Sequence, residues 1–293
     1  MSKVKSISVG NGDMFYITHG SDNFSIIDCS MSEDNKVSIV KELKRESKDK
    51  GIRRFISTHP DEDHISGLEY LDSEMGIQNF YCVKNEATKE EDTPAFEKYC
   101  ELRDSEKKSF YIEKGCSRKW MNEEGDGRGS SGINILWPNV SNKFYKEQLQ
   151  IAKDGGSPNN ISAIIKYELS DGATILWMGD LETDFMENIK DDLDLPKVNI
   201  LFAPHHGRDS GTVPTELLDA MKPDIIIIGE ADSEHLNYYD GYNTITQNSA
   251  GDIILDCEKK KVHIYVSSDT YSVDFLDNEN KSDYDNYIGT LNL

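Results

Sequence analysis

The chain has 293 residues, and its 54 acidic and 32 basic residues give a formal net charge of -22. Hydrophobic residues make up 37% of it, so a packed core of one large or two small α/β domains is feasible, and the composition argues against wholesale disorder. The acidic balance argues against strong, nonspecific binding to duplex nucleic acid, which needs many Lys and Arg contacts to phosphate. It does not exclude a phosphodiester substrate, because bound divalent cations reverse the local field.

Cysteine usage and hydropathy favour a cytoplasmic protein. The five cysteines include no CxxC pair, so they form neither a disulfide framework nor zinc-finger spacing. The first residues lack the apolar run of a signal peptide. No window approaches the roughly 18 apolar residues of a membrane span. We therefore expect free thiols in a reducing compartment and no membrane partner.

Short apolar runs alternate with helical patterns along the chain, without repeats or linkers. In the first part we predict strands at residues 4–9, 14–17, 23–28 and 55–58, and helices at 36–45 and from 65 to 71. In the second part we predict strands at 133–137, 162–167, 174–178, 198–203, 224–228, 252–255 and 262–266, and helices at 181–189 and 215–221. Two β-rich halves with interspersed helices indicate a four-layer αββα sandwich in one domain that spans residues 1–293.

Two segments stand apart from this pattern. Residues 86–132 are charged and weakly periodic, and they contain the flexible sequence Asp126-Gly-Arg-Gly-Ser-Ser-Gly132. We expect this segment to be an insertion or a mobile lid, since long loops of this kind are often functional. Residues 270–293 are expected to form a C-terminal extension.

The segment His59-Pro-Asp61-Glu-Asp63-His64 is the most informative in the chain. It follows an apolar strand, and Pro60 keeps His59 out of helical conformation before a helix restarts near His64. Imidazole nitrogens and carboxylate oxygens are the ligands that Zn²⁺, Mn²⁺ and Fe²⁺ use in proteins. A helix cap would explain one of the acids, but not two acids flanked by two histidines. The segment therefore predicts a metal site.

Three later strand ends carry matching groups, namely Asp180, the pair His205-His206, and His235. Taken alone, Asp180 is better explained as a helix cap, and His235 as a surface residue. Adjacent histidines in a strand would face opposite sides, so the loop must position at least one of them for a specific task. Loops at strand ends are where α/β folds place active sites.

This ordered set resembles the metallo-β-lactamase fold superfamily, whose common motif is His-x-His-x-Asp-His. Here Asp61 replaces the second His, and that variant resembles the metallo-β-lactamase domain of the ComEC-type DNA-uptake proteins and their free-standing relatives. Other matching elements are Val9-Gly10-Asn11-Gly12-Asp13, Ile135-Leu-Trp-Pro138, Asn160-Ile-Ser162 and Ala203-Pro-His205-His206-Gly207. The resemblance runs from Val4 to about Val266 and omits residues 86–132.

The resemblance implies a centre for two divalent ions, either Zn²⁺ or Mn²⁺, with Mg²⁺ also open. It implies the metal ligands His59, Asp61, Asp63, His64, Asp180 and His205, with Asp180 bridging. It implies catalytic roles for Asp63 and His206, and substrate contacts for Asn160, Ser162, His206 and His235. The division of roles between His205 and His206 stays open. The chain departs from the family pattern where Asn160 and Ser162 stand in place of the middle His ligand, and where Leu236 follows His235 instead of Pro.

The implied chemistry is hydrolysis by an activated water, with Asp63 holding that water or accepting its proton. A histidine of the 205–206 pair would stabilise developing charge or protonate the leaving oxygen. We expect a phosphodiesterase or nuclease that acts on a cyclic nucleotide, an oligonucleotide or short single-stranded nucleic acid. An ester or lactone hydrolase stays open, as does a partner-dependent or inactive subunit of a larger assembly, because a fold does not fix a function. A protein partner and a homo-oligomer stay open too.

Overall fold

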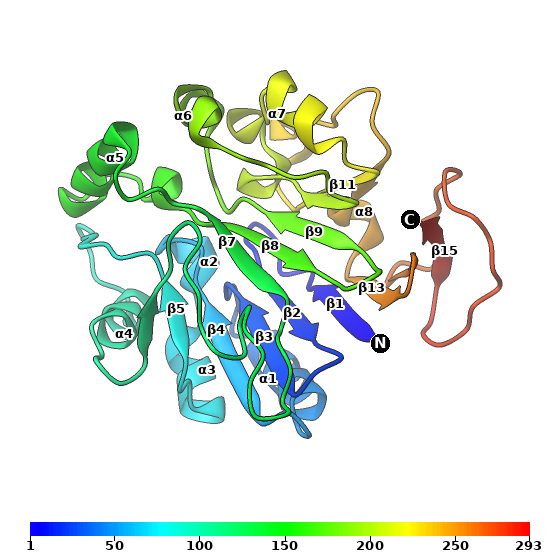
Figure 1. Ribbon diagram of the computed structural model, residues 1–293, viewed down its shortest axis with the longest axis horizontal. Coiled ribbons are helices and arrows are strands. Elements are labelled where there is room, and N and C mark those ends of the chain that lie inside the picture. The colour runs from blue at the N-terminus through cyan, green and yellow to red at the C-terminus, as the bar shows by residue number, and fades with distance from the viewer.

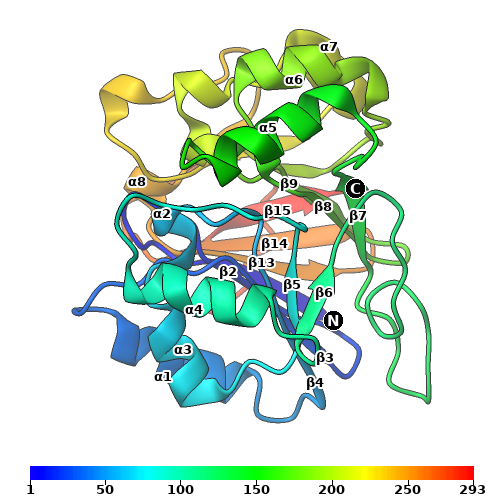
Figure 2. The ribbon, with the colours of Figure 1, turned by 90° about the vertical axis from the view of Figure 1, so that its left-hand side faces the viewer.

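In the computed structural model, which describes residues 1–293, two β-sheets pack face to face between two layers of helices (Figures 1 and 2). The predicted four-layer αββα sandwich is thereby confirmed. No helix combines the length and the apolar character that crossing a membrane requires.

The first sheet has nine strands in the order β15-β14-β13-β1-β2-β3-β4-β5-β6. Neighbours from β15 to β3 are antiparallel, and those from β3 to β6 are parallel. Parallel strands place their carboxyl ends, and the loops that follow, at one edge of a sheet. The strands are β1 Ser2–Ser6, β2 Phe15–Thr18, β3 Asn23–Ile27, β4 Ile52–Ile56, β5 Phe80–Cys82, β6 Ser109–Tyr111, β13 Ile253–Glu258, β14 Lys261–Val266 and β15 Tyr287–Asn292.

The second sheet has six strands in the order β12-β11-β10-β9-β8-β7. Strands β9 to β12 run parallel, whereas β7, β8 and β9 are antiparallel. The four isoleucines of β11 are all buried, as expected for a strand covered on both faces. The strands are β7 Ile133–Trp137, β8 Ile164–Glu168, β9 Thr174–Trp177, β10 Ile200–Phe202, β11 Ile225–Ile228 and β12 Thr244–Thr246.

Helices cover the outer face of each sheet (Figure 2). The first sheet is covered by α1 Lys36–Glu46, α3 Leu68–Met75 and α4 Pro94–Arg103, and the short α2 Glu62–Ile65 precedes α3. The second sheet is covered by α5 Lys143–Lys153, α6 Thr183–Ile189 and α7 Thr215–Met221. Shorter elements are α8 Gln247–Ala250, η1 Asn159–Ile161, η2 Lys190–Asp192, η3 His205–Gly207, η4 Asp209–Gly211 and η5 Ser233–His235.

One apolar core joins the two halves. Its 54 buried residues come from the facing sides of both sheets and from the helices over the second sheet, whereas a separate cluster of 21 lies mainly beneath α1, α3 and α4. Helix α1 shows how this packing arises, because Ile39, Val40 and Leu43 form a single buried stripe on it. The larger cluster fixes the sheets against each other, and with them the loops at their shared edge.

Residues 86–132 contain α4 and the edge strand β6, and they bury Ile112 and Met121 in the main core. The C-terminal residues 270–293 contain β15, which extends the same sheet at its opposite edge. The assignment of residues 86–132 as an insertion or lid stays a prediction. Their contribution to the sheet and core was hidden in the sequence by their many charged residues.

Several element boundaries differ from the expectation, and two of these differences shape the site. Strand β1 ends at Ser6 and not at residue 9, because residues 7–14 leave the sheet as a loop closed by the Ile7 amide bonding the Met14 carbonyl at 3.0 Å. The helix expected from residue 65 to 71 is divided into α2 and α3. Gly67 stands between them at φ 82°, a left-handed conformation that a helix interior does not contain.

Candidate metal centre

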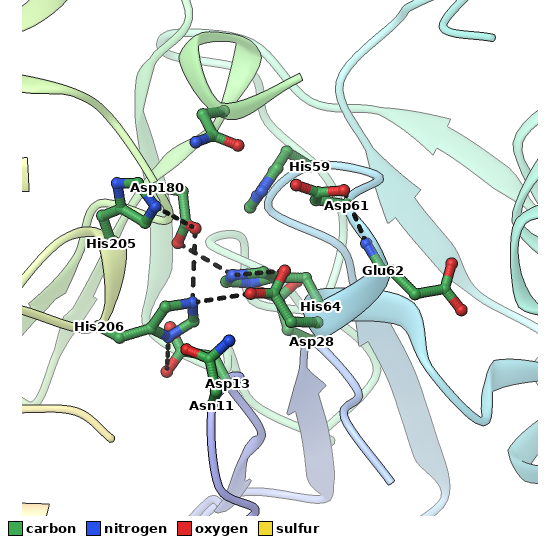
Figure 3. A network of polar contacts seen from close by, with 12 residues as sticks. Asn11, Asp13, Asp28, His59, Asp61, Glu62, His64, Asp180, His205 and His206 are labelled. Carbon is green, nitrogen blue, oxygen red and sulfur yellow. Dashed lines mark hydrogen bonds and ion pairs between the residues drawn. The ribbon is translucent and has the colours of Figure 1, made fainter. Parts of the chain in front are cut away.

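Loops from both sheets meet at one edge of the sandwich and bring imidazoles and carboxylates together (Figure 3). Each group comes from a loop that follows a strand. Asp13 comes from the β1–β2 loop, Asp28 follows β3, His59 to His64 follow β4, Asp180 follows β9, and His205 and His206 follow β10.

A cluster of four residues forms the centre of the site. One ligand atom from each of Asp13, His64, Asp180 and His206 lies within 4.8 Å of the other three. His64 Nε2 is 2.9 Å from Asp180 Oδ1, and His206 Nε2 is 3.5 Å from Asp180 Oδ2. His206 Nδ1 is 3.2 Å from Asp13 Oδ1. Asp63 borders this cluster, with its Oδ2 3.3 Å from His206 Nε2.

Buried ligand atoms without partners show that the site suits a cation. Nε2 of His59, Nε2 of His64, Oδ1 of Asp180 and Nδ1 of His206 are buried and make no hydrogen bond. Three of the four atoms lie in ion pairs within the cluster, which leaves the Nε2 atom of His59 without a polar partner. Leaving a buried polar atom without a hydrogen bond costs about 1–3 kcal/mol, and a cation at this place would satisfy all four atoms. Nitrogen and oxygen donors of this kind suit Zn²⁺ and Mn²⁺. The residues therefore fit a divalent cation.

Asp28 holds His64 in place from behind. The Oδ2 atom of Asp28 lies 2.9 Å from His64 Nδ1. The same oxygen accepts a hydrogen bond from the Thr58 hydroxyl at 2.6 Å, and Oδ1 accepts one from the Thr58 amide at 2.7 Å. A carboxylate on the outer nitrogen of a ligand histidine fixes the orientation and tautomer of the ring. His64 Nε2 is thereby directed into the cluster.

The β9–α6 loop positions Asp180 by the close approach of Gly179 to the Ser162 side chain. A Cβ on Gly179 would lie 2.6 Å from Ser162 Oγ, so only glycine fits. The Asp180 amide then donates to Ser162 Oγ at 3.0 Å. Asn160 makes two hydrogen bonds with Glu182, of 2.8 and 3.0 Å. Ser162 and Asn160 thus hold the Asp180 loop, and their expected contacts with substrate stay predictions.

His205 and His206 both adopt a left-handed backbone conformation, with φ of 54° and 57°. For residues other than glycine such a conformation costs of order 1–3 kcal/mol, and it is concentrated at functional sites. His206 is buried and lies in the four-residue cluster. His205 lies at the rim, where Nε2 is 3.7 Å from Asp180 Oδ2 and Nδ1 lies 3.0 Å from Ser210 Oγ. The geometry thus makes His206 the stronger ligand candidate of the two.

His59 and Asp61 lie on the opposite side of the site from Asp13 (Figure 3). The ring of His59 is buried, and its centroid lies 4.2 Å from that of His64. The Asp61 carboxylate is 38% exposed, caps α2 through the Glu62 amide and pairs with Lys89 at 3.3 Å. These two residues adjoin the four-residue cluster without belonging to it.

His235 is not brought into the cluster. Its side chain is 56% exposed, and its one ion pair is with the neighbouring Glu234, at 3.6 Å. A role for His235 in binding substrate stays a prediction.

Charge pairing dominates the electrostatics of the cluster. Burial opposes the charged form of His64 and His206, but Asp180 together with Asp28 or Asp13 raises the pKa of each imidazole well above its usual value. Burial likewise opposes ionisation of Asp180, yet the two imidazoles hold its pKa well below the usual range. Without a cation, two protons therefore neutralise the buried carboxylates, and a divalent cation would take their place.

Two further groups have pKa values set by the same neighbours. Burial, aided by the charge of His64, lowers the pKa of His59 to about 4, so this imidazole is neutral and free to act as a ligand. Burial raises the pKa of Asp63, but the hydrogen bond with His206 and the charge of His64 outweigh it and bring the pKa to about 2. Asp63 is therefore an anion at neutral pH.

Asp13 and Asp28 are the two site residues that the sequence analysis did not assign. Asp28 directly follows β3, just as Asp180 closely follows β9, so its place after an apolar strand was an available signal. Asp13 reaches His206 because Gly12 packs against Ser30 and the Asp63 carbonyl, where a Cβ would lie within 2.6 Å of the latter. That contact joins distant parts of the chain and leaves no local pattern.

An αββα sandwich with a His/Asp cluster where its two sheets meet defines a metallo-β-lactamase fold with a candidate metal site. In agreement, residues 7–128 match the family model described as "Metallo-beta-lactamase superfamily". The match supports a metallo-β-lactamase domain in the first part of the chain, and the chemistry of that superfamily is generally hydrolytic. The ComEC-type subgroup is not distinguished by this match.

Solved structures show weaker likenesses. A mutant of the CmlA β-hydroxylase is 10% identical with a TM-score of 0.45 over 78% of this chain and 45% of its own. A metallo-β-lactamase with an HARLDQ motif from Cronobacter sakazakii is 15% identical, with a TM-score of 0.32, and the match covers 61% of this chain and 60% of that protein. A β-lactamase from Chitinophaga pinensis is 14% identical, with a TM-score of 0.35, and the match covers 69% of this chain and 78% of that protein. The chain thus spans less than two thirds of the first two structures, and no curated protein matches it.

Proposed function

We propose that this chain is a metal-dependent phosphodiesterase that acts on short single-stranded nucleic acid. The observation that carries the proposal is the buried cluster of Asp13, His64, Asp180 and His206, with its unpaired ligand atoms beside the anionic Asp63. A purely structural network would satisfy those atoms with internal hydrogen bonds. The cluster therefore supports a metal-binding enzyme over an inactive subunit.

The donor set supports a phosphodiester substrate. The proposed ligand set contains as many carboxylates as histidines, because Asp61 replaces a His in the motif and Asp13 joins the cluster. Oxygen donors favour Mn²⁺ and Mg²⁺ relative to softer sites, and these cations commonly act on phosphate esters. The resemblance of the His59–His64 motif to ComEC-type proteins supports the same class. Zn²⁺ remains compatible with the histidines.

The chain's own residues would divide the work between them. His64, His206, Asp180 and Asp13 would hold one cation, and His59 with Asp61 would hold a second. When bound, divalent cations lower the pKa of water toward neutrality and offset charge on a phosphoryl group. Asp63, ionised and next to the cluster, would hold the attacking water by a hydrogen bond.

His205 would contact the substrate from the rim of the site. Burial lowers its pKa below the usual value, so its imidazole is neutral near pH 7 and can donate one N–H. Its side chain is 15% exposed and adjoins Asp180. It is therefore placed to donate a hydrogen bond to an oxygen of the substrate or leaving group.

A panel of small substrates tests this function. Wild type and Asp180→Asn would be assayed on bis-p-nitrophenyl phosphate and on p-nitrophenyl acetate, with Mn²⁺, Zn²⁺ or Mg²⁺ added after chelation. We expect the wild type to hydrolyse the diester and not the acetate, and Asp180→Asn to lose that activity. Hydrolysis of the acetate alone would indicate an ester hydrolase. Absence of both activities and of bound metal would indicate an inactive subunit.

A further inference from the structure

Two clefts follow one another along the seam between residues 84–90 and helix α5. The first, of about 310 Å³, begins at Pro60 and Asp61 and is bounded by residues 87–90 and 155–158. The second, of about 280 Å³, is lined by residues 84–86 and by α5. Thr88 bridges the seam, because its amide and hydroxyl donate to the carbonyls of Ala152 and Lys153 at 3.0 and 2.9 Å. Thr88 lines the first cleft and Lys153 lines the second, so the two clefts adjoin and together make a groove that begins at Asp61, beside the candidate metal centre.

The groove reverses the charge balance of the chain. Its charged lining consists of four lysines, Lys84, Lys89, Lys146 and Lys153, and three acids, Asp61, Glu86 and Glu90. The whole chain has 54 acidic and 32 basic residues, so a basic majority here is a local departure. A strongly acidic surface elsewhere would repel a polyanion and confine its binding to this groove.

The lysines differ in how they are engaged. Lys153 pairs with Glu86 at 2.5 Å and Lys89 pairs with Asp61 at 3.3 Å, whereas Lys84 and Lys146 form no ion pair. Lys89 stands at the junction of groove and metal centre, so its ammonium could exchange a carboxylate partner for a phosphate. Lys84 and Lys146 can bind an anion without giving up a carboxylate partner.

An exposed aromatic ring adjoins the far part of the groove. Tyr111 on β6 is 40% exposed, and the Lys84 ammonium lies 5.7 Å from the centroid of its ring. Single-stranded nucleic acids are bound by positive grooves that follow the backbone and by aromatic rings on which bases stack. Tyr111 with Lys84 supplies both features, which favours a nucleic acid over a simple anion.

We propose that Lys84, Lys89, Lys146 and Lys153, here called the lysine groove, bind the backbone of a single-stranded oligonucleotide and lead it to the metal centre. This inference rests on the proposed function and narrows it. The substrate is an oligonucleotide of several residues, because a cyclic mononucleotide would occupy the metal centre without reaching Lys146. The lysines bind and orient the strand, and they take no part in bond cleavage.

Binding to metal-free protein tests the groove without any turnover. Fluorescence anisotropy of a fluorescein-labelled single-stranded oligonucleotide would compare the wild type with Lys84→Glu/Lys146→Glu, both kept in chelator. We expect the variant to bind roughly tenfold more weakly or worse, and its log–log salt slope to fall by about 1.4 for two lost phosphate contacts. The matched control is Lys259→Glu/Lys260→Glu, which makes the same charge change at the exposed β13–β14 turn. Equal affinity of the two double variants would overturn the proposal, as would a wild type that binds no oligonucleotide.

Kinetics separate the groove from the proposed function. We expect KM of Lys84→Glu/Lys146→Glu to rise about tenfold more for an oligonucleotide than for bis-p-nitrophenyl phosphate, with kcat much less affected. If the wild type cleaves diesters but the groove variant keeps the wild-type KM for the oligonucleotide, the groove is refuted and the proposed function is not. If the protein cleaves no diester with any metal, but the groove variant binds oligonucleotide more weakly than the wild type does, the proposed function is refuted and the groove is retained.

Discussion

The Nε2 atom of His64 lies 2.9 Å from Oδ1 of Asp180, yet neither atom has a hydrogen-bond partner. The contact is an ion pair between the imidazole and the carboxylate. Both are buried, His64 completely and Asp180 to 1% exposure. A cation could bind between these two buried atoms once the imidazole proton leaves. Replacing Asp180 is therefore the most direct test of the centre.

Asp180→Asn should abolish tight metal binding. The amide keeps the size of the carboxylate but removes its charge, so we expect the affinity for Mn²⁺ or Zn²⁺ to fall by more than the 10–100-fold typical of supporting residues. Isothermal titration calorimetry on chelator-treated protein would measure it. Asp240→Asn, on an exposed loop, is the control and should bind metal as the wild type does. Equal affinities of the two variants would remove Asp180 from the ligand set.

Metal binding should release protons, and its affinity should rise with pH. The pKa values of His64 and His206 are raised well above their usual value, so both imidazoles are protonated near neutral pH in the metal-free protein. A cation can bind their nitrogens only after those protons leave. Affinity therefore weakens as pH falls, and it strengthens until pH passes the raised pKa values. Titrations in buffers of different ionisation enthalpy would count the protons. A measured enthalpy that does not depend on the buffer would contradict this protonation state.

Asp28→Asn should weaken metal binding although Asp28 is outside the four-residue cluster. The substitution retains shape and one acceptor oxygen but loses the charge that holds His64 Nδ1. We expect roughly 10–100-fold lower metal affinity. Thr58→Val removes one hydroxyl donor to Asp28, at 2.6 Å, and leaves the amide bond to the same carboxylate, so its effect should be smaller. A reversed order of the two effects would mean that packing around Thr58, and not the Asp28–His64 contact, sets the affinity.

Much of the site was predictable because strand ends carry it. The apolar runs ending near residues 58, 178 and 203 placed His59 to His64, Asp180 and His206 at carboxyl ends of strands, and the sandwich brings those ends to one edge. The same reasoning also placed His235 near the site, because a strand-end pattern does not specify where a side chain points. In the structure His235 is largely exposed.

The rest of the site depends on contacts between distant loops. Asp13 joins His206 only because Gly12 permits a close approach to the Asp63 loop, with the Asp13 amide bonding the Asp63 carbonyl at 3.1 Å. The lysine groove combines Lys84 with Lys146, which are distant in the sequence and line the same cleft. Alternation in a strand could not divide the roles of His205 and His206, because both residues adopt left-handed conformations after the strand has ended.

Asp61→Asn tests whether the site holds a second cation. Asp61 pairs with Lys89 and caps α2, so its carboxylate is already engaged, yet the adjacent His59 has an unpaired Nε2 that suits a ligand. If both residues hold a second ion, the wild type should contain two metal ions per chain by elemental analysis and Asp61→Asn should contain one. Asp180→Asn should contain fewer still, because its carboxylate adjoins both positions. Unchanged metal content in Asp61→Asn would mean that the Asp61 carboxylate only pairs with Lys89 and caps the helix. The Lys89 ammonium would then be the second positive charge of the site, since a cation near a carboxylate offsets its charge much as a metal ion does.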